Sequence, residues 1–111
     1  MSVPGAWILH YNWACDGRYG NTPITFNADG TWASAPYTGT WSSHNDQILF
    51  QFAGESPPTT YGGTVVDGAM VGRSTAFTGA KGCWYALKST LTTVALAESK
   101  PAHDQSGAAT K

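Results

Sequence analysis

Residues 24–52 constrain the fold of this chain more than any other stretch, because short aromatic and β-branched segments alternate there with turns of hairpin length. The turn at residues 27–30 ends in Asp-Gly, which supplies the positive φ that a tight hairpin needs. A polar corner at residues 43–46 leads into residues 48–52, whose composition favours a pleated strand. This stretch therefore predicts a meander of antiparallel strands.

The rest of the chain continues the pattern of short strands and turns. Residues 5–13 alternate a largely aromatic face with a second face that includes His10. After Phe52, two consecutive prolines predict a loop. Asp67-Gly68 predicts a two-residue hairpin with positive φ at both positions. Residues 83–88 are the last predicted strand.

Eight such segments of even spacing predict an all-β fold, a single eight-stranded antiparallel up-and-down β-barrel closed between its first and last strands. Closure leaves no sheet edge exposed. The barrel domain is assigned to residues 1–88. The polar remainder, residues 89–111, is expected to be a flexible, mostly disordered C-terminal extension.

The composition of the chain limits the partners that it can have. At 111 residues there is room for one domain, and charged residues make up only 12%. The net charge of −1 and six scattered Lys or Arg give no basic stripe, which argues against nucleic acid and anionic membranes. No cofactor motif or metal-ligand cluster is recognisable, so neither a cofactor nor a metal is expected.

The sequence also gives an expectation for the location of the protein. No apolar run approaches the ~20 residues that span a bilayer, and residues 1–4 lack the charged and apolar parts of a secretory signal. The default expectation is a cytoplasmic protein without a membrane span. The low charge and the abundance of Trp, Gly and Thr leave an extracellular location open, and a homo-oligomer is left open as well.

A resemblance to a known group can be stated on two segments. Gly5-Ala6-Trp7 resembles the Gly-x-Trp opening of lipocalin-like and avidin-like barrels, the calycin group, and residues 24–32 are similar to the second hairpin of small bacterial lipocalin-like domains. The similarity in architecture covers about residues 5–88. The Thr-Asp-Tyr motif of lipocalins and the Trp-bearing central segment of avidins are absent, so neither specificity carries over. The resemblance implies a barrel that holds a small apolar or heterocyclic molecule.

The leading functional hypothesis is a non-enzymatic barrel that binds a small apolar or aromatic molecule at its mouth. The aromatic residues exceed what so small a barrel is expected to pack away, so some rings should line a binding surface. We expect stacking on Trp13 or Trp41 and orientation by the hydroxyl of Tyr11 or Tyr61. Arg73 either points to solvent or, in the other strand register, anchors an anionic ligand in the cavity.

Cys15 and Cys83 are the only cysteines. In a closed barrel the end of the first strand and the start of the last are antiparallel neighbours, close enough for a disulfide. The alternative is a pair of reduced, partly buried thiols, which a cytosolic location would favour. Both alternatives stay open from the sequence.

Three other functions compete with small-molecule binding. A carbohydrate-binding module would use exposed Trp and Tyr beside polar groups to stack on a glycan. A barrel enzyme of the cyclase or isomerase type would use His10 as a general base, although most strand histidines are structural. An interaction or inhibitor domain would use the loop at residues 54–58.

Overall fold

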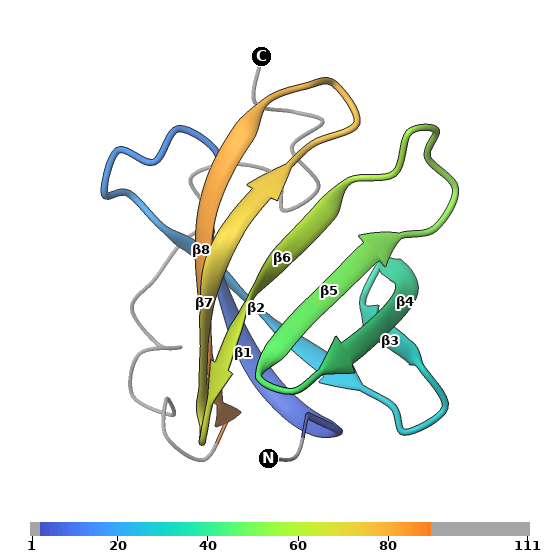
Figure 1. The fold of residues 1–111 in the computed structure, drawn as a ribbon. Helices are drawn as coiled ribbons and strands as arrows, with labels where there is room; N and C mark the ends of the chain where they lie inside the picture. Colours follow the sequence, from blue (N-terminus) through green and yellow to red (C-terminus); the bar gives the residue numbers. More distant parts are fainter. Residues whose placement is uncertain (1–2, 90–111) are drawn as a thin grey trace.

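The structure is a computed structural model that describes residues 3–89 of the chain. Its eight antiparallel strands follow chain order around a closed barrel, and β1 pairs with β8 (Figure 1). This confirms the predicted fold class. The C-terminal extension lies outside the described residues, apart from Ser89. The strands are β1 (Gly5–Asn12), β2 (Gly20–Phe26), β3 (Thr31–Ser34), β4 (Tyr37–His44), β5 (Gln47–Phe52), β6 (Thr60–Val66), β7 (Ala69–Thr75) and β8 (Lys81–Lys88).

Two hairpins of the barrel use the same turn. Gly30, between β2 and β3, has φ of 90°, and Gly79, between β7 and β8, has φ of 93°. In each turn the glycine N–H donates to the carbonyl three residues earlier, Asn27 at 3.1 Å and Ala76 at 2.8 Å. A residue with a Cβ is strained at such φ values, which is why glycine ends both turns.

The β6–β7 hairpin has the predicted two-residue turn, with Val66 paired to Ala69 across it. Positive φ occurs at Asp67 (53°), however, and not at Gly68. The expectation of positive φ at both positions was therefore wrong. Hairpins with positive φ at the first turn position alone are common, and Asp tolerates that conformation.

The interior of the barrel is filled mainly by aromatic side chains. Four of the five tryptophans, Trp7, Trp13, Trp32 and Trp84, are at most 5% exposed, so the predicted surplus of exposed rings is not found among them. The buried apolar cluster consists of Val3, Trp7, Leu9, Tyr11, Trp13, Ile24, Phe26, Trp32, Ile48, Phe50, Phe52, Tyr61, Val65, Met70, Ala76, Trp84 and Ala86.

Glycines in the barrel wall make room for these rings. Trp84 lies against Gly63, where an added Cβ would come within 2.9 Å of the indole. Its Nε1 donates to two wall carbonyls, Arg73 O at 3.0 Å and Gly62 O at 3.3 Å. Trp32 lies against Gly39 in the same way and donates to Gln51 O at 3.1 Å. A small barrel can hold bulky indoles because they lie flat against glycine and satisfy their N–H groups on the backbone.

Trp7 lies near the start of β1. It is fully buried, and its Nε1 donates to Val3 O at 2.8 Å. Lys88 pairs with Trp7 across the β1–β8 seam, and its Nζ lies 4.7 Å from the centroid of the ring. The ammonium group of Lys88 therefore lies over this indole.

Candidate functional site

The residues expected at the barrel mouth are part of the packed interior. Tyr11, Trp13 and Tyr61 are 3%, 5% and 0% exposed. The Trp13 ring meets Tyr61 edge-on at 5.9 Å. Trp41 is half-buried, and its Nε1 donates to Asn27 O at 2.8 Å. The structure thus brings three of these residues into the core and leaves Trp41 at its margin.

Phe50 occupies the centre of the interior between the predicted site residues. It pairs with Trp41 on one side and with Tyr61 on the other, and its ring is stacked on Tyr61 at 4.8 Å. Trp32 and Trp84 meet Phe50 edge-on at 5.7 and 5.4 Å. These contacts make Phe50 part of one packed cluster with Trp32, Tyr61 and Trp84.

Arg73 lies on the outer face of β7. On the same strand, Met70 and Ser74 face the barrel interior and are buried, whereas Arg73 is exposed. The alternative in which Arg73 enters the cavity is therefore wrong. Among residues 3–89 its guanidinium has no assigned hydrogen bond or ion pair, which leaves a cation with free donors on the surface.

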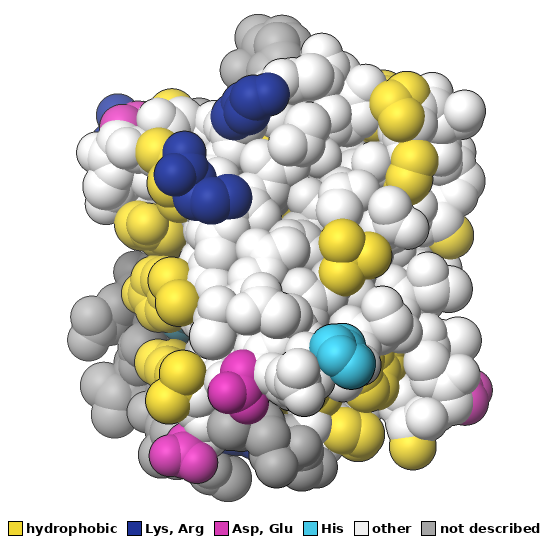
Figure 2. All heavy atoms as spheres, viewed as in Figure 1, with side chains coloured by type: hydrophobic (Ala, Val, Ile, Leu, Met, Phe, Trp, Pro, Cys, Tyr) yellow, Lys and Arg dark blue, Asp and Glu magenta, His cyan; other side chains and the backbone are white. Residues whose placement is uncertain are grey.

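Arg73 belongs instead to a groove of about 590 Å³ on the outer face of β4–β7. Across these four strands Ser42, Leu49, Gly62 and Arg73 form one cross-strand row. A Cβ added at Gly62 would meet nothing within 4 Å, so the missing side chain opens the floor of the groove. Figure 2, seen from the same side as Figure 1, shows hydrophobic and basic side chains separated from one another by other side chains and backbone.

The groove combines apolar contact with polar groups at both ends. Leu49 and Val71 are 44% and 59% exposed, and both line it. Arg73, on β7, lies at one end of the groove, and the exposed His44, on β4, lies at the other end. His44 pairs with Gln47 and so belongs to the cross-strand row next to that of Arg73. Of this set the sequence singled out only Arg73. The signal that could have found the groove is Gly62-Gly63, a glycine pair inside a predicted strand.

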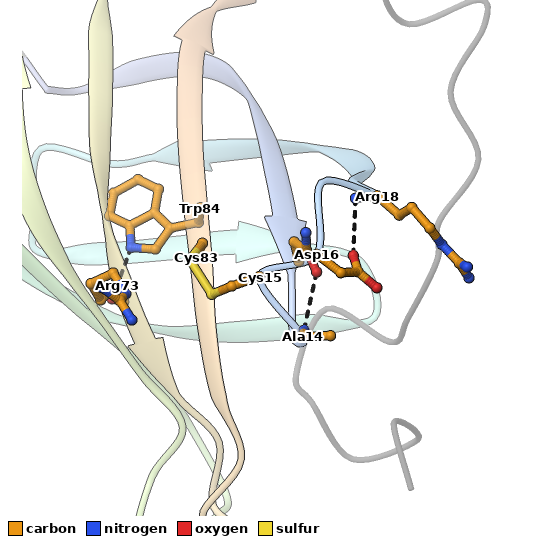
Figure 3. Close-up of a disulfide and its surroundings, with 8 residues drawn as sticks. Ala14, Cys15, Asp16, Arg18, Arg73, Cys83 and Trp84 are labelled. Carbon is orange, nitrogen blue, oxygen red and sulfur yellow. Dashed lines mark hydrogen bonds between the residues drawn. A yellow bond between two sulfur atoms is a disulfide. The ribbon is translucent and has the colours of Figure 1, made fainter.

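A disulfide bond joins Cys15 to Cys83, with the α-carbons 5.3 Å apart. Of the two alternatives left open by the sequence, the structure has the bonded one. Figure 3 shows the bond beside Arg73, which pairs with Cys83 across β7 and β8. In the same loop, Asp16 accepts a hydrogen bond from the Arg18 backbone N–H at 3.0 Å, which lowers the pKa of the Asp16 carboxyl. The disulfide bond attaches the β1–β2 loop to the start of β8, and the hydrogen bond of Asp16 holds a turn within that loop.

His10 lies away from both the mouth and the groove. It sits on the outer face of β1, is 4% exposed and stacks on Tyr85 with ring centroids 4.3 Å apart. Burial lowers the pKa of the imidazole and raises the pKa of the Tyr85 phenol, so both groups are held neutral. Within residues 3–89 no group of three or more His, Cys, Asp or Glu is placed to hold a metal ion.

Comparisons with known proteins add no relative. No protein-family model matches the chain, and no curated protein matches it significantly. The closed barrel of eight antiparallel strands is compatible with a calycin-like fold. Over the described residues, no helix has both the length and the apolar character to cross a membrane.

Proposed function

We propose that this protein is a small-molecule-binding barrel whose ligand is an apolar or aromatic molecule with an anionic group, and that the ligand binds in the outer groove of β4–β7. One observation carries the proposal. Two exposed hydrophobic side chains, Leu49 and Val71, line the same groove as Arg73, a cation without an assigned partner among the described residues. The aromatic interior supports this location, because the residues expected at the mouth, Tyr11, Trp13 and Tyr61, are packed into the buried core.

The contacts available suggest a modest affinity. Covering Leu49 and Val71 would contribute on the order of 1 kcal/mol each, from the apolar area that they expose. A charge-assisted hydrogen bond from Arg73 to a carboxylate or sulfonate would add about 1.5–3 kcal/mol. The sum of about 4 kcal/mol is a gross contact energy, from which the entropy cost of association has to be subtracted. Measurable binding therefore requires further contacts, for which Thr64 and Gln47 also line the groove.

The alternatives receive less support from the geometry. A carbohydrate module needs an exposed aromatic platform, but Trp13 is 5% exposed and Trp41 is only half-exposed at the core margin. A barrel enzyme needs its general base beside the bound substrate. His10 lies on β1, outside the set of residues that line the groove. Binding without catalysis is therefore the function that we propose.

The disulfide bears on where such a protein would act. A bond between Cys15 and Cys83 persists in oxidising surroundings and is rare in the cytosol. We therefore propose an extracellular location, because the disulfide favours it over the cytoplasmic default.

A titration with 8-anilino-1-naphthalenesulfonate, an aromatic anion, would test the groove. In backbone amide NMR spectra we expect saturable shifts at Leu49, Gly62 and Val71. Arg73→Gln should weaken binding at least about fivefold, since the lost hydrogen bond is charge-assisted. Arg18→Gln is the matched control, because it removes an exposed arginine from the β1–β2 loop, away from the groove.

Two outcomes would contradict the proposal. Shifts concentrated at Trp13 and Tyr61 would return the site to the barrel mouth. If the Arg73→Gln variant and the unmodified protein bound the probe with equal affinity, the anionic group would not contribute to recognition.

A further inference from the structure

The disulfide bond lies at the basic end of the outer groove. The cross-strand row that crosses the groove reaches Arg73 on β7, and the next residue of this row is Cys83 on β8. Both side chains lie on the outer face, and residues directly opposite in an antiparallel pair have β-carbons about 4.5–5.5 Å apart. Figure 3 shows Arg73 on one side of Cys83 and the bond to Cys15 on the other. The cation that we assign to ligand binding is therefore also the neighbour of a disulfide cysteine.

The two ends of the bond differ in accessibility. Cys15 is exposed in the β1–β2 loop, whereas Cys83 is half-buried in β8, between β1 and β7. An incoming thiolate has to reach the sulfur that it attacks, and the other sulfur is the leaving group. Accessibility therefore favours attack at Cys15, with Cys83 as the leaving group.

The backbone at Cys15 also makes the bond labile. Its φ is 52°, in the left-handed region that a residue with a β-carbon adopts at a cost in energy. Its N–H donates to Asn12 O at 3.4 Å, a long hydrogen bond. Exposed or strained disulfides are the ones that thiols reduce readily, in contrast to structural ones. The exposed end of this bond is thus held by an unfavourable backbone conformation that opening of the bond releases.

The charges around the leaving group are mainly positive. Arg73 lies opposite Cys83, and Lys81 lies two residues earlier on the same face of β8. The acidic residue next to Cys15 in the chain, Asp16, accepts the backbone N–H of Arg18 and is thereby oriented within its own loop. A neighbouring cation stabilises a thiolate relative to the thiol, which makes Cys83 the better leaving group.

We propose that the bond between Cys15 and Cys83 is a redox-reactive site that controls the groove. A dithiol reductant opens the bond, and the Cys83 thiolate then pairs with Arg73 and withdraws this cation from the anionic group of the ligand. In the disulfide form the sulfur carries no charge, so Arg73 is free to bind the ligand. The regulation rests on the proposed function, whereas the chemistry at the bond does not.

The reaction has two steps. A thiolate of the reductant forms a bond to Cys15 Sγ, the bond between Cys15 and Cys83 breaks, and the electron pair leaves on Cys83 Sγ. The second thiol of the reductant then loses its proton and attacks the mixed disulfide, so that Cys15 leaves and takes up a proton. The reductant is oxidised to its own disulfide, and two electrons pass to the protein.

The reactivity is tested on the oxidised protein without a ligand. After brief treatment with glutathione, an acid quench and alkylation, mass spectrometry should find the mixed disulfide at Cys15 and the alkylated thiol at Cys83. Arg73→Gln should slow reduction by dithiothreitol at least about threefold, because the leaving thiolate loses its cation. Arg18→Gln is the matched control and should leave the rate unchanged, since Figure 3 shows its side chain pointing away from the bond. Glutathione at Cys83, or equal rates for Arg73→Gln and the unmodified protein, would overturn the proposal.

The regulation is tested with two variants that both lack the bond. Cys15→Ser keeps the Cys83 thiol, whereas Cys15→Ser/Cys83→Ser has no thiol beside Arg73. By amide NMR titration with 8-anilino-1-naphthalenesulfonate at pH 8, the double variant should bind within about twofold of the oxidised protein, and Cys15→Ser at least about fivefold more weakly.

Circular dichroism of both variants checks that the barrel is folded, and the glutathione mapping and reduction rates need only proteins that keep the bond. Equal affinity of the two folded variants would overturn the regulation. Failure of the oxidised protein to bind the probe would instead contradict the proposed function, while the mapping and the rates would still decide the reactivity of the bond.

Discussion

The two adjacent glycines of β6, Gly62 and Gly63, allow a stringent test of the barrel wall. A Cβ at Gly63 would lie 2.2 Å from the carbonyl oxygen of Val71 and 2.9 Å from the Trp84 ring. A Cβ at Gly62 would meet nothing within 4 Å. The same substitution, Gly→Ala, should therefore have opposite effects at neighbouring positions.

The magnitudes follow from the contacts. At Gly63 the new methyl group overpacks the interior, which costs about 1–3 kcal/mol. Movement of Trp84 would relieve the contact with its ring but not the closer one with the Val71 carbonyl. If the ring moves, its N–H also loses the bonds to Arg73 O and Gly62 O, at about 1 kcal/mol more. Gly63→Ala should thus destabilise the protein by about 3 kcal/mol. Gly62→Ala should stabilise it by about 0.5 kcal/mol, because the unfolded chain loses conformational freedom.

Equilibrium unfolding in urea, followed by tryptophan fluorescence and circular dichroism, measures both variants. Thermal unfolding gives a second measure of the difference. A change of about 1 kcal/mol in the unfolding free energy shifts the melting temperature of a domain of this size by about 4 °C or more, so the two variants should differ by at least about 10 °C. Unfolding free energies within about 0.5 kcal/mol of each other would refute the wall packing of Trp84. A larger loss for the Gly62 variant would mean that β6 presents the opposite face to the interior.

Three further predictions concern the disulfide, His10 and Trp7. Replacing Cys15 and Cys83 with serine should lower the unfolding free energy by about 4 kcal/mol, as expected for a sequence separation of 68 residues, and equal melting temperatures of the oxidised and reduced protein would contradict this. Because burial lowers the pKa of His10, protonation favours the unfolded state: stability should be constant above about pH 6.5 and fall as the pH is lowered towards 5. His10→Gln should abolish this slope in urea titrations, whereas the control His44→Gln should keep it. Trp7→Ala should cost about 3–5 kcal/mol in the same assay, since the ring is fully buried.

Much of the barrel could be predicted from local patterns. Strand alternation and Asp-Gly turns are short-range signals, and the structure has all eight expected strands in chain order. Closure between the first and last strands was predicted too, and in the structure it pairs Lys88 with Trp7. These features depend on spacing along the chain, which a single sequence contains.

The candidate site was harder to predict, because it depends on which side chains the wall can accommodate. Counting aromatic residues suggested a surplus of exposed rings, but Gly39, Gly63 and Gly82 let indoles lie against the backbone instead. That accommodation brought Trp13 into the core, whereas Arg73 lines a groove on the outer face. No local pattern reports how much volume a barrel wall can absorb.

By itself, the sequence determined the strands, their order and the positions of the turns, because these depend on residues close in the chain. Only the tertiary structure decided what each face does. Gly62 and Gly63 are identical and adjacent, yet one opens a surface groove and the other seats Trp84. The difference arises because strand register assigns them to opposite sides of the wall, and the atoms across each side come from strands distant in sequence.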